Sequence, residues 1–272
     1  MSERHFSIAA GASMAAGAYT ADEMMTIAAA RMLHNGTVCF VGIGLPSAAA
    51  NVARLTHAPD AVLIYESGPI ASKPTVLPLS IGDGELAETA ETVVSIPEMF
   101  AYWLQGGRID FGFLGAAQID RFANINTTVI GDYRKPRTRL PGAGGAPEIA
   151  ASSKEVLITL RQNKRAFVEK LDFVTSGGHF DGGDARKRMG LPGKGPVAVI
   201  TDLGIMTPDH ETKELTLTSV HPGVTVEKAV ENTGWPLKIS PRLATTAAPT
   251  EVELSVLRDL NERTARAHAG QA

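Results

Sequence analysis

The chain has 272 residues, of which 44% are hydrophobic and 20% are charged, so it can bury a large core and has neither a disordered nor a membrane-embedded composition. A formal net charge of −3 gives no electrostatic basis for binding nucleic acid, and no apolar run is long enough to span a bilayer. The single cysteine, Cys39, excludes an internal disulfide and a cysteine-based metal cage, and it favours a reducing, cytoplasmic compartment. We therefore expect no nucleic-acid partner, no membrane association and no bound metal.

The beginning of the chain differs in composition from the rest. Residues 6–19 consist largely of Ala, Gly and Ser, which superficially suggests a secretory signal. Glu3 lies in what would be the basic region of such a signal, and large apolar residues are sparse. We therefore expect residues 1–19 to be a flexible N-terminal extension and residues 20–272 to form one domain.

Regular structure is predicted to begin at Thr20. With Glu23 three residues later, it forms a capping-box pattern that opens a helix. This helix should stop at Asn35-Gly36, before a short strand at residues 37–42 (TVCFVG).

A tight turn and a second strand follow. Residues 42–47 (GIGLPS) form the turn, and Pro46 suits the first turn of the helix that comes next. The second strand covers residues 61–66 (AVLIYE) and is apolar up to its last residue.

The same alternation continues along the chain. A helix near residues 97–105, ended by Gly106-Gly107, precedes a strand at residues 109–115. Further apolar runs that we interpret as buried strands lie at residues 156–160, 167–174 and 197–203. Buried strands that alternate with helices predict an α/β fold with a mostly parallel central sheet flanked by helices.

The last part of the chain has different patterns. Residues 214–220 alternate in polarity, as expected for an antiparallel strand added at a sheet edge. From Thr250 onward the pattern indicates a charged amphipathic helix. Its expected apolar positions are Val252, Leu254, Val256, Leu257 and Leu260.

Glu66 is the first candidate for chemistry. It ends an apolar strand and is therefore placed at the carboxyl end of the sheet, where open α/β folds form their sites. The following Ser67-Gly68-Pro69 predicts a sharp turn that allows a substrate to approach the backbone. A glutamate that begins a helix or stabilises a turn fits the same local pattern, so this feature alone leaves both interpretations open.

The second candidate is the glycine loop, residues 141–146 (PGAGGA). Its glycines, Gly142, Gly144 and Gly145, are dense enough to expose consecutive backbone N–H groups, which can form an anion nest or an oxyanion hole. A plain flexible loop is the alternative.

Two asparagines form the third candidate. Asn124 and Asn126 straddle one residue and could present two amides to one cavity. Asparagines in turns more often bond their own backbone, and the local sequence alone favours that interpretation.

Other motifs are weaker. Gly42-x-Gly44 after a strand resembles part of a dinucleotide-binding motif, but Ser47 occupies the position of the third glycine. His179, Asp181 and Asp184 lie in one loop without a metal-ligand spacing. The chain also lacks the G-x-S-x-G elbow of a serine hydrolase.

Taken in order, these motifs resemble the B subunits of class I coenzyme A (CoA) transferases of the glutaconate type. The similarity covers about residues 20–235. It is carried by the segments at residues 41–46 (VGIGLP), 65–69 (YESGP), 80–83 (SIGD), 115–120 (GAAQID), 124–126 (NIN), 130–133 (IGDY), 142–146 (GAGGA), 170–175 (KLDFVT), 188–192 (RMGLP) and 199–202 (VITD).

The resemblance implies the class I CoA-transferase fold and assigns site residues. Glu66, in the E-S-G motif, would be the nucleophile, and the glycine loop would lie over the acyl-CoA and help to form the oxyanion hole. Asn124 would lie near the thioester. Many family members have Gly immediately before this asparagine, where this chain has Ala123. If that position needs a positive φ, the asparagine would be slightly displaced.

The resemblance also implies partners and substrates. A separate A subunit would complete an α2β2 or larger assembly, and a CoA thioester would be a substrate, with no permanently bound cofactor. Residues 38–91 are most similar to members that move CoA from succinyl-CoA to a 3-oxo dicarboxylic acid of aromatic degradation.

Several alternatives remain open. They are another dicarboxylate acceptor, an acyl-CoA hydrolase of the same fold, and a non-catalytic nucleotide-binding subunit. Four cations near the glycine loop, Arg134, Lys135, Arg137 and Arg139, fit either a site for the distal carboxylate or an exposed basic turn.

Overall fold

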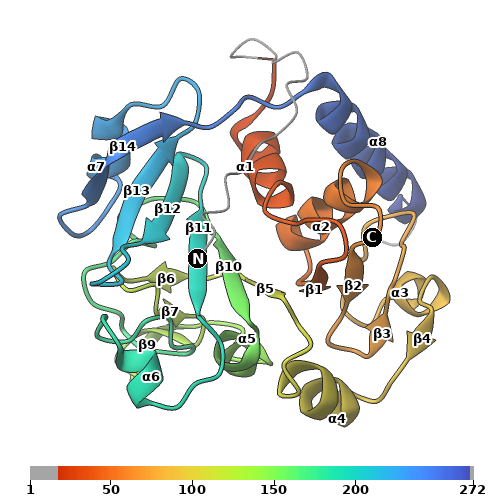
Figure 1. Cartoon of the computed structure of the whole chain (residues 1–272), viewed down its shortest axis with the longest axis horizontal. Helices are drawn as coiled ribbons and strands as arrows, with labels where there is room; N and C mark the ends of the chain where they lie inside the picture. The colour runs from red at the N-terminus through yellow and green to blue at the C-terminus, as the bar shows by residue number, and fades with distance from the viewer. Residues whose placement is uncertain (1–17, 270–272) are drawn as a thin grey trace.

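A ten-stranded sheet organises residues 18–269, the part of the chain that this computed structural model describes (Figure 1). In spatial order its strands are β14 (Lys238–Thr245), β13 (Leu215–Val220), β12 (Gly204–Pro208), β11 (Pro196–Ile200), β10 (Glu155–Thr159), β5 (Phe111–Leu114), β1 (Val38–Phe40), β2 (Val62–Ile64), β3 (Pro69–Ile70) and β4 (Thr92–Val93). All pairings from β11 to β2 are parallel. On either side of this parallel centre the next strand is antiparallel: β12 pairs with β11, and β3 pairs with β2. The expected mostly parallel sheet is therefore confirmed. The strand predicted at residues 214–220 is present as β13 and pairs antiparallel with β12, but it is not at the sheet edge, because β14 lies outside it and pairs with it in parallel.

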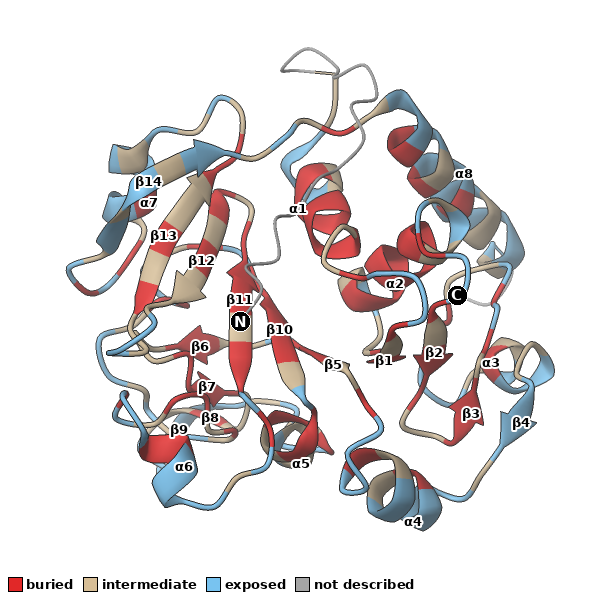
Figure 2. Ribbon diagram, viewed as in Figure 1, coloured by how far each residue is buried: buried red, intermediate tan, exposed pale blue. Residues whose placement is uncertain are grey.

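Helices flank the sheet, and two small sheets extend it. The helices are α1 (Ala21–Ala30), α2 (Leu45–Leu55), α3 (Gly84–Glu88), α4 (Ile96–Glu98), the π-helix η1 (Met99–Leu104), α5 (Ala146–Ser152), α6 (Ala185–Arg188), α7 (Val226–Glu231) and α8 (Glu251–His268). The two-stranded antiparallel sheets are β6 (Gln118–Ile119) with β7 (Ile125–Asn126), and β8 (Val129–Gly131) with β9 (Pro136–Arg139). Figure 2 shows α1 and α2 largely buried, while α8 contacts both and keeps one exposed side.

Both faces of the central sheet are buried. On β10, Leu157 belongs to the core that contains α1 and α2, whereas Val156 and Ile158 belong to the core on the opposite face. Because successive strand residues point to opposite faces, two buried faces require an uninterrupted apolar strand. This explains why the central strands read as continuous apolar runs.

The predicted N-terminal helix is present but shorter than expected. The Thr20 hydroxyl accepts a hydrogen bond from the Glu23 N–H at 3.1 Å, and the Glu23 carboxylate accepts one from the Thr20 N–H at 2.7 Å. The helix ends at Ala30, because the next N–H groups turn back to carbonyls three residues earlier, with Met32 N–H donating to Ala29 O at 3.1 Å. The extension expected at residues 1–19 falls almost wholly outside the described residues.

One predicted strand is wrong. Residues 167–174 form no strand; the neighbourhood holds only isolated bridges, from Phe167 to Ile119 and from Ser176 to Ile125. The segment runs beside the short β6–β7 sheet instead of joining the central one, and the Phe167 carbonyl accepts a hydrogen bond from Gly234 N–H at 2.8 Å. Apolar content alone did not distinguish these two situations.

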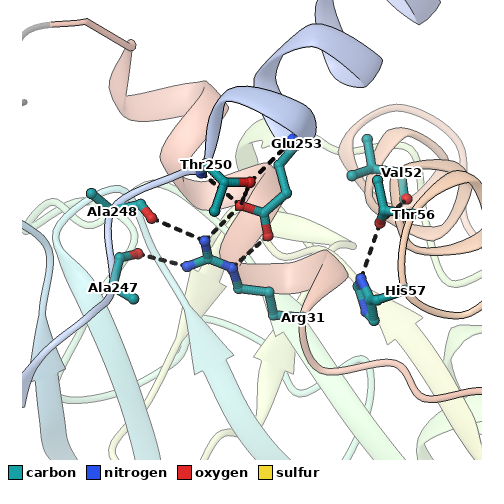
Figure 3. Close-up of polar contacts among 8 residues, drawn as sticks. All are labelled: Arg31, Val52, Thr56, His57, Ala247, Ala248, Thr250 and Glu253. Atoms are coloured by element: carbon teal, nitrogen blue, oxygen red, sulfur yellow. Dashed lines mark hydrogen bonds and ion pairs between the residues drawn. The ribbon is translucent and has the colours of Figure 1, made fainter. Parts of the chain in front are cut away.

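Arg31 fastens the C-terminal helix to the first helix (Figure 3). Its guanidinium donates to both carboxylate oxygens of Glu253, each at 2.7 Å, and to the carbonyl oxygens of Ala247 and Ala248. Burial alone would raise the pKa of Glu253, but hydrogen bonds from Arg31 and Thr250 lower it below its ordinary value. The stability that this pair contributes is therefore lost as the pH falls through that lowered pKa.

The predicted C-terminal amphipathic helix is confirmed as α8. Leu254, Leu257 and Leu260 are buried, as expected. Val252 is 65% exposed, so its assignment to the apolar side was wrong.

Candidate active site

Glu66 lies in the tight turn that joins β2 to β3. The turn is closed by Gly68 N–H donating to Tyr65 O at 2.9 Å and by Tyr65 N–H donating to Pro69 O at 3.1 Å. Gly68 has a φ of +115°, and a Cβ there would lie 1.9 Å from the carbonyl oxygen of Val94, so this position requires glycine. The turn places Glu66 at the carboxyl end of β2, where the sequence predicted it.

The Glu66 carboxylate has no partner within residues 18–269. It accepts no hydrogen bond and forms no ion pair there, and the residue is half-buried. No helix begins at Glu66 either. The structural alternative, a glutamate that begins a helix or stabilises the turn, therefore has no support. The oxygen lone pairs of the Glu66 carboxylate are all available to a ligand.

The backbone of the glycine loop reaches this carboxylate from a distant part of the chain. A Cβ on Gly145 would lie 3.0 Å from Oε1 of Glu66 and 2.6 Å from Cζ of Phe100. A side chain at this position would therefore force the Phe100 ring to move and would press against the Glu66 carboxylate. The structure thus brings together Glu66 and Gly145, two of the residues that the sequence singled out.

The glycine loop is anchored at its start and open further on. Gly142 N–H donates to Thr127 O at 2.9 Å, and the Thr127 hydroxyl donates to Gly142 O at 2.8 Å. Within the described residues, the N–H groups of Ala143, Gly144 and Gly145 donate no hydrogen bond. The loop is therefore a held segment with free donors, as expected of an anion-binding backbone and not of a plain flexible loop.

Phe100 is a contact that sequence reasoning missed. It lies on η1, and its ring packs edge-on against Phe40 with centroids 6.2 Å apart. The sequence showed only an apolar helix near residues 97–105, and nothing in that pattern indicates the wider π-helical turns or the contact with Gly145. Single π-helical turns often occur at functional sites.

Asn124 is fully occupied by its own surroundings. Its amide N–H groups donate to Asp120 Oδ2 at 2.9 Å and to Phe180 O at 2.8 Å. Its carbonyl oxygen accepts from Gly178 N–H at 2.8 Å and from Phe180 N–H at 3.0 Å. The residue is 4% exposed. Its hydrogen-bonding capacity is therefore spent on holding loops together, and none remains for a thioester.

The side-chain amide of Asn126 is also occupied by neighbouring residues. Its amide donates to Gln118 Oε1 and to Val129 O, each at 2.7 Å, and its carbonyl oxygen accepts from Thr128 N–H at 2.9 Å. The structural interpretation favoured by the local sequence of these asparagines is supported, and the two amides do not face a shared cavity.

A buried arginine links the Asn124 loop to the glycine loop. Arg186, 7% exposed, donates to Gly178 O at 2.9 Å and, on α5, to Ala150 O at 2.9 Å. Burial lowers its pKa to about 10, and within the described residues it has no carboxylate partner. Because α5 begins directly after Gly145, this arginine ties the helix behind the glycine loop to the loop that Asn124 holds.

The remaining sequence candidates take structural roles. The imidazole of His179 donates through Nε2 to Pro196 O at 2.8 Å, and Asp181 and Asp184 both pair with Arg188. Residues 18–269 contain no group of His, Cys, Asp and Glu arranged to hold a metal ion. In the same part of the chain, no helix is long and apolar enough to cross a membrane.

Comparison with known proteins gives this site its context. The family model described as "Coenzyme A transferase" matches residues 22–232, so the chain belongs to the coenzyme A transferase family. It is 70% identical, over 93% of its own length and 98% of the relative, to the B subunit of 3-oxoadipate CoA-transferase from Pseudomonas knackmussii. This relationship makes the chain a component of a CoA-transferase enzyme.

Solved structures agree with the fold. The crystal structure of glutaconate CoA-transferase from Acidaminococcus fermentans superposes with a TM-score of 0.86 at 36% identity, covering 91% of this chain and 97% of that one. The decarboxylase AibA/AibB superposes with a TM-score of 0.77 at 26% identity, covering 93% and 99%. The same fold therefore also serves a different reaction, and the reaction must be argued from the site.

Proposed function

We propose that this chain is the catalytic B subunit of an enzyme that moves CoA from succinyl-CoA to 3-oxoadipate in the β-ketoadipate pathway of aromatic degradation. The observation that carries the proposal is the unpaired Glu66 carboxylate against the backbone of Gly145. The 70% identity to a 3-oxoadipate CoA-transferase component supports this acceptor over glutaconate or another dicarboxylate.

The reaction follows from a carboxylate nucleophile. Glu66 attacks the succinyl-CoA carbonyl and expels the CoA thiolate, which leaves a mixed anhydride on Glu66. The thiolate attacks the Glu66 carbonyl, succinate leaves, and a glutamyl-CoA thioester remains. The carboxylate of 3-oxoadipate then reverses these steps and departs as its CoA ester, which frees Glu66. Covalent catalysis thereby divides one exchange into easier steps, and thioester energy is conserved without ATP.

Each addition creates an oxyanion that needs hydrogen-bond donors. The free N–H groups of Gly144 and Gly145 supply them in this proposal, while Gly142 anchors the loop through Thr127. A fixed backbone donor does not have to reorganise during the reaction, and losing one donor of this kind costs about 10²–10³ in rate. Asn124 supports the loops behind this site and has no contact with the thioester.

An A subunit is expected to cover the site. Beside the Glu66 turn, Val94 N–H donates to Gly68 O at 3.0 Å, and the same segment exposes Val93, Ile96 and Tyr102 by 53%, 54% and 63%. Exposed apolar side chains so close together in the sequence favour a protein partner, and a partner there would exclude water from the anhydride and the thioester. We propose an α2β2 assembly, no permanently bound cofactor, and a cytoplasmic location consistent with the free, buried Cys39.

Trapping the covalent intermediate tests the proposal. The chain is co-purified with its A subunit, incubated with succinyl-CoA without acceptor, treated with borohydride and mapped by peptide mass spectrometry. We expect Glu66 reduced to the alcohol, with wild type lacking succinyl-CoA as the control. An unmodified Glu66 in an enzyme that releases free CoA from succinyl-CoA would contradict transfer and indicate a hydrolase.

A further inference from the structure

The β8–β9 hairpin carries a group of cations that lack acidic partners. Arg134, Lys135, Arg137 and Arg139 are all exposed, and within residues 18–269 none forms an ion pair. The nearby carboxylate of Asp132 is used by the turn itself, since its Oδ1 accepts from the N–H groups of Arg134 and Lys135 at 2.8 and 3.1 Å. On a chain with a net charge of −3, this is a local excess of positive charge.

This hairpin is continuous with the glycine loop. Beyond the β8–β9 pairing, Leu140 N–H donates to Thr128 O at 3.0 Å and Gly142 N–H donates to Thr127 O at 2.9 Å. The ladder therefore runs from the cations to Gly142, and Gly145 meets the nucleophile three residues further on. One paired segment thus connects the cations to Gly142, three residues before the glycine that contacts Glu66.

The end of the hairpin is held in place. The Tyr133 ring stacks on Phe173 with centroids 5.3 Å apart. The guanidinium of Arg139 lies 4.7 Å from the Tyr133 centroid and donates to Tyr133 O at 2.9 Å. Arg139 is therefore occupied as a brace, which leaves Arg134, Lys135 and Arg137 as the cations free to bind. A braced hairpin loses less conformational freedom when it binds.

Length decides which anion these cations suit. At about 3.3 Å per extended residue, Arg137 is about 17 Å and Arg134 about 26 Å along the chain from Gly142. The pantetheine arm of CoA has about 13 bonds between its sulfur and the diphosphate, or about 16 Å when extended. The carboxylates of a six-carbon diacid are only about 6 Å apart by the same measure. The hairpin therefore matches the phosphates of CoA and lies too far away for the distal carboxylate of the acid.

We propose that Arg134, Lys135 and Arg137 bind the diphosphate and 3′-phosphate of CoA and so position its thioester at Glu66. This proposal rests on the CoA transfer proposed above and adds the subsite that holds the nucleotide end. Arginine and lysine are the side chains that commonly bind phosphate oxygens in proteins. Phosphates held there extend the pantetheine arm along the ladder toward the glycine loop.

The test compares two thioesters in the complete A–B enzyme. One variant carries Arg134→Gln, Lys135→Gln and Arg137→Gln, and the matched control carries Lys164→Gln, Arg165→Gln and Arg242→Gln, three exposed cations that also form no ion pair within the described residues. Steady-state kinetics use succinyl-CoA and succinyl-pantetheine, which has the same arm and no phosphates. We expect the hairpin variant to raise KM for succinyl-CoA about 10–100-fold, with kcat nearly unchanged. The KM values for succinyl-pantetheine and for the acceptor acid should not change.

Other outcomes overturn the subsite. An unchanged KM for succinyl-CoA, or an equal rise for both thioesters, shows that the hairpin does not bind phosphates. A raised KM for the acceptor acid alone assigns the cations to its carboxylate, and loss of the A–B complex on size-exclusion chromatography assigns them to the contact between the two chains. Failure of the proposed function differs from all of these, because wild-type enzyme would then not transfer CoA from succinyl-CoA at all.

Discussion

Glu66 and Asn124 each lie between two short strands, β2 and β3 for Glu66 and β6 and β7 for Asn124. The resemblance to class I CoA transferases placed both near the thioester, but their hydrogen bonding in the structure differs. The Glu66 carboxylate has no hydrogen-bond partner within the described residues, whereas Asn124 uses both of its amide N–H groups and its carbonyl oxygen on neighbouring loops. A group that must react with a substrate needs unfilled bonding capacity, and a group that holds loops needs the opposite. The contrast supports our proposal that Glu66 reacts with the substrate and that Asn124 holds the neighbouring loops.

Replacing Glu66, the proposed nucleophile, should give the largest effect. Glu66→Gln keeps the shape of the side chain but removes its negative charge, and Glu66→Asp retracts the carboxylate by one methylene. We expect each to lower kcat for CoA transfer by more than about 10³-fold, a loss beyond that of a single oxyanion donor. The free energy of unfolding should change by less than about 0.5 kcal/mol, because Glu66 has no bond to lose.

The matched control is Glu88→Gln, at an exposed acid on α3. Its activity and stability should equal those of wild type. Near-normal CoA transfer by purified Glu66→Gln would contradict the proposed difference between Glu66 and Asn124, since the free carboxylate would then have no role in the reaction.

Replacing the supporting residue should act on stability instead. Asn124→Ala leaves the buried N–H group of Gly178 and the partly buried N–H group of Phe180 without an acceptor, and each buried group left unpaired costs about 1–3 kcal/mol. We expect the free energy of unfolding to fall by about 3 kcal/mol in urea titrations. Activity per folded molecule should remain within a few fold of wild type.

Asn261→Ala, at an exposed position on α8, is the control and should change stability by less than about 0.5 kcal/mol. If Asn124→Ala instead kept full stability and lost transfer, the asparagine would act on the thioester, as the resemblance implied.

The sequence predicted the parts of the site that depend on local patterns. The apolar strand before Glu66, the glycine that turns the chain at Gly68 and the glycine loop are all visible in short segments. The contact between Gly145 and Glu66 is not, because it depends on how distant segments pack. The saturation of Asn124 was hidden for the same reason, since its partner Phe180 lies far along the chain.

The glycine loop offers a smaller and more local test of the contrast. Gly145→Ala would place a Cβ 2.6 Å from the Phe100 ring and 3.0 Å from Glu66 Oε1, so the carboxylate or the loop must move. We expect kcat to fall about 10²-fold, a size typical of a misplaced oxyanion donor.

Gly144→Ala is the matched variant. Gly144 has a φ of +50°, and a Cβ there would have no other atom within 4 Å. The substitution therefore adds backbone strain of about 1–2 kcal/mol without a clash. Thermal unfolding should detect that strain, and kcat should stay within about tenfold of wild type. Equal losses of kcat in both variants would mean that general distortion of the loop, and not contact with Glu66, limits the reaction.

Ala123 gives the smallest expected effect and decides whether its departure from the family pattern matters. Its φ is +58°, so the position does require the left-handed conformation, yet Asn124 beside it makes all its hydrogen bonds. Ala123→Gly would relieve about 1–2 kcal/mol of backbone strain. It would also lose a buried methyl group worth about 0.8 kcal/mol and add about 0.5–1 kcal/mol of chain entropy cost.

These opposing terms leave a change of less than about 0.5 kcal/mol in the free energy of unfolding, with kcat unchanged. Lys213→Gly is the control, because Lys213 has a φ of +62° and no buried methyl group of this kind, so relief of strain should dominate there. A large gain in activity for Ala123→Gly would show that alanine displaces Asn124 from a working position. An unchanged kcat would show that the backbone strain at Ala123 has no effect on the reaction at Glu66. Asn124 would then support the site equally well after alanine or glycine.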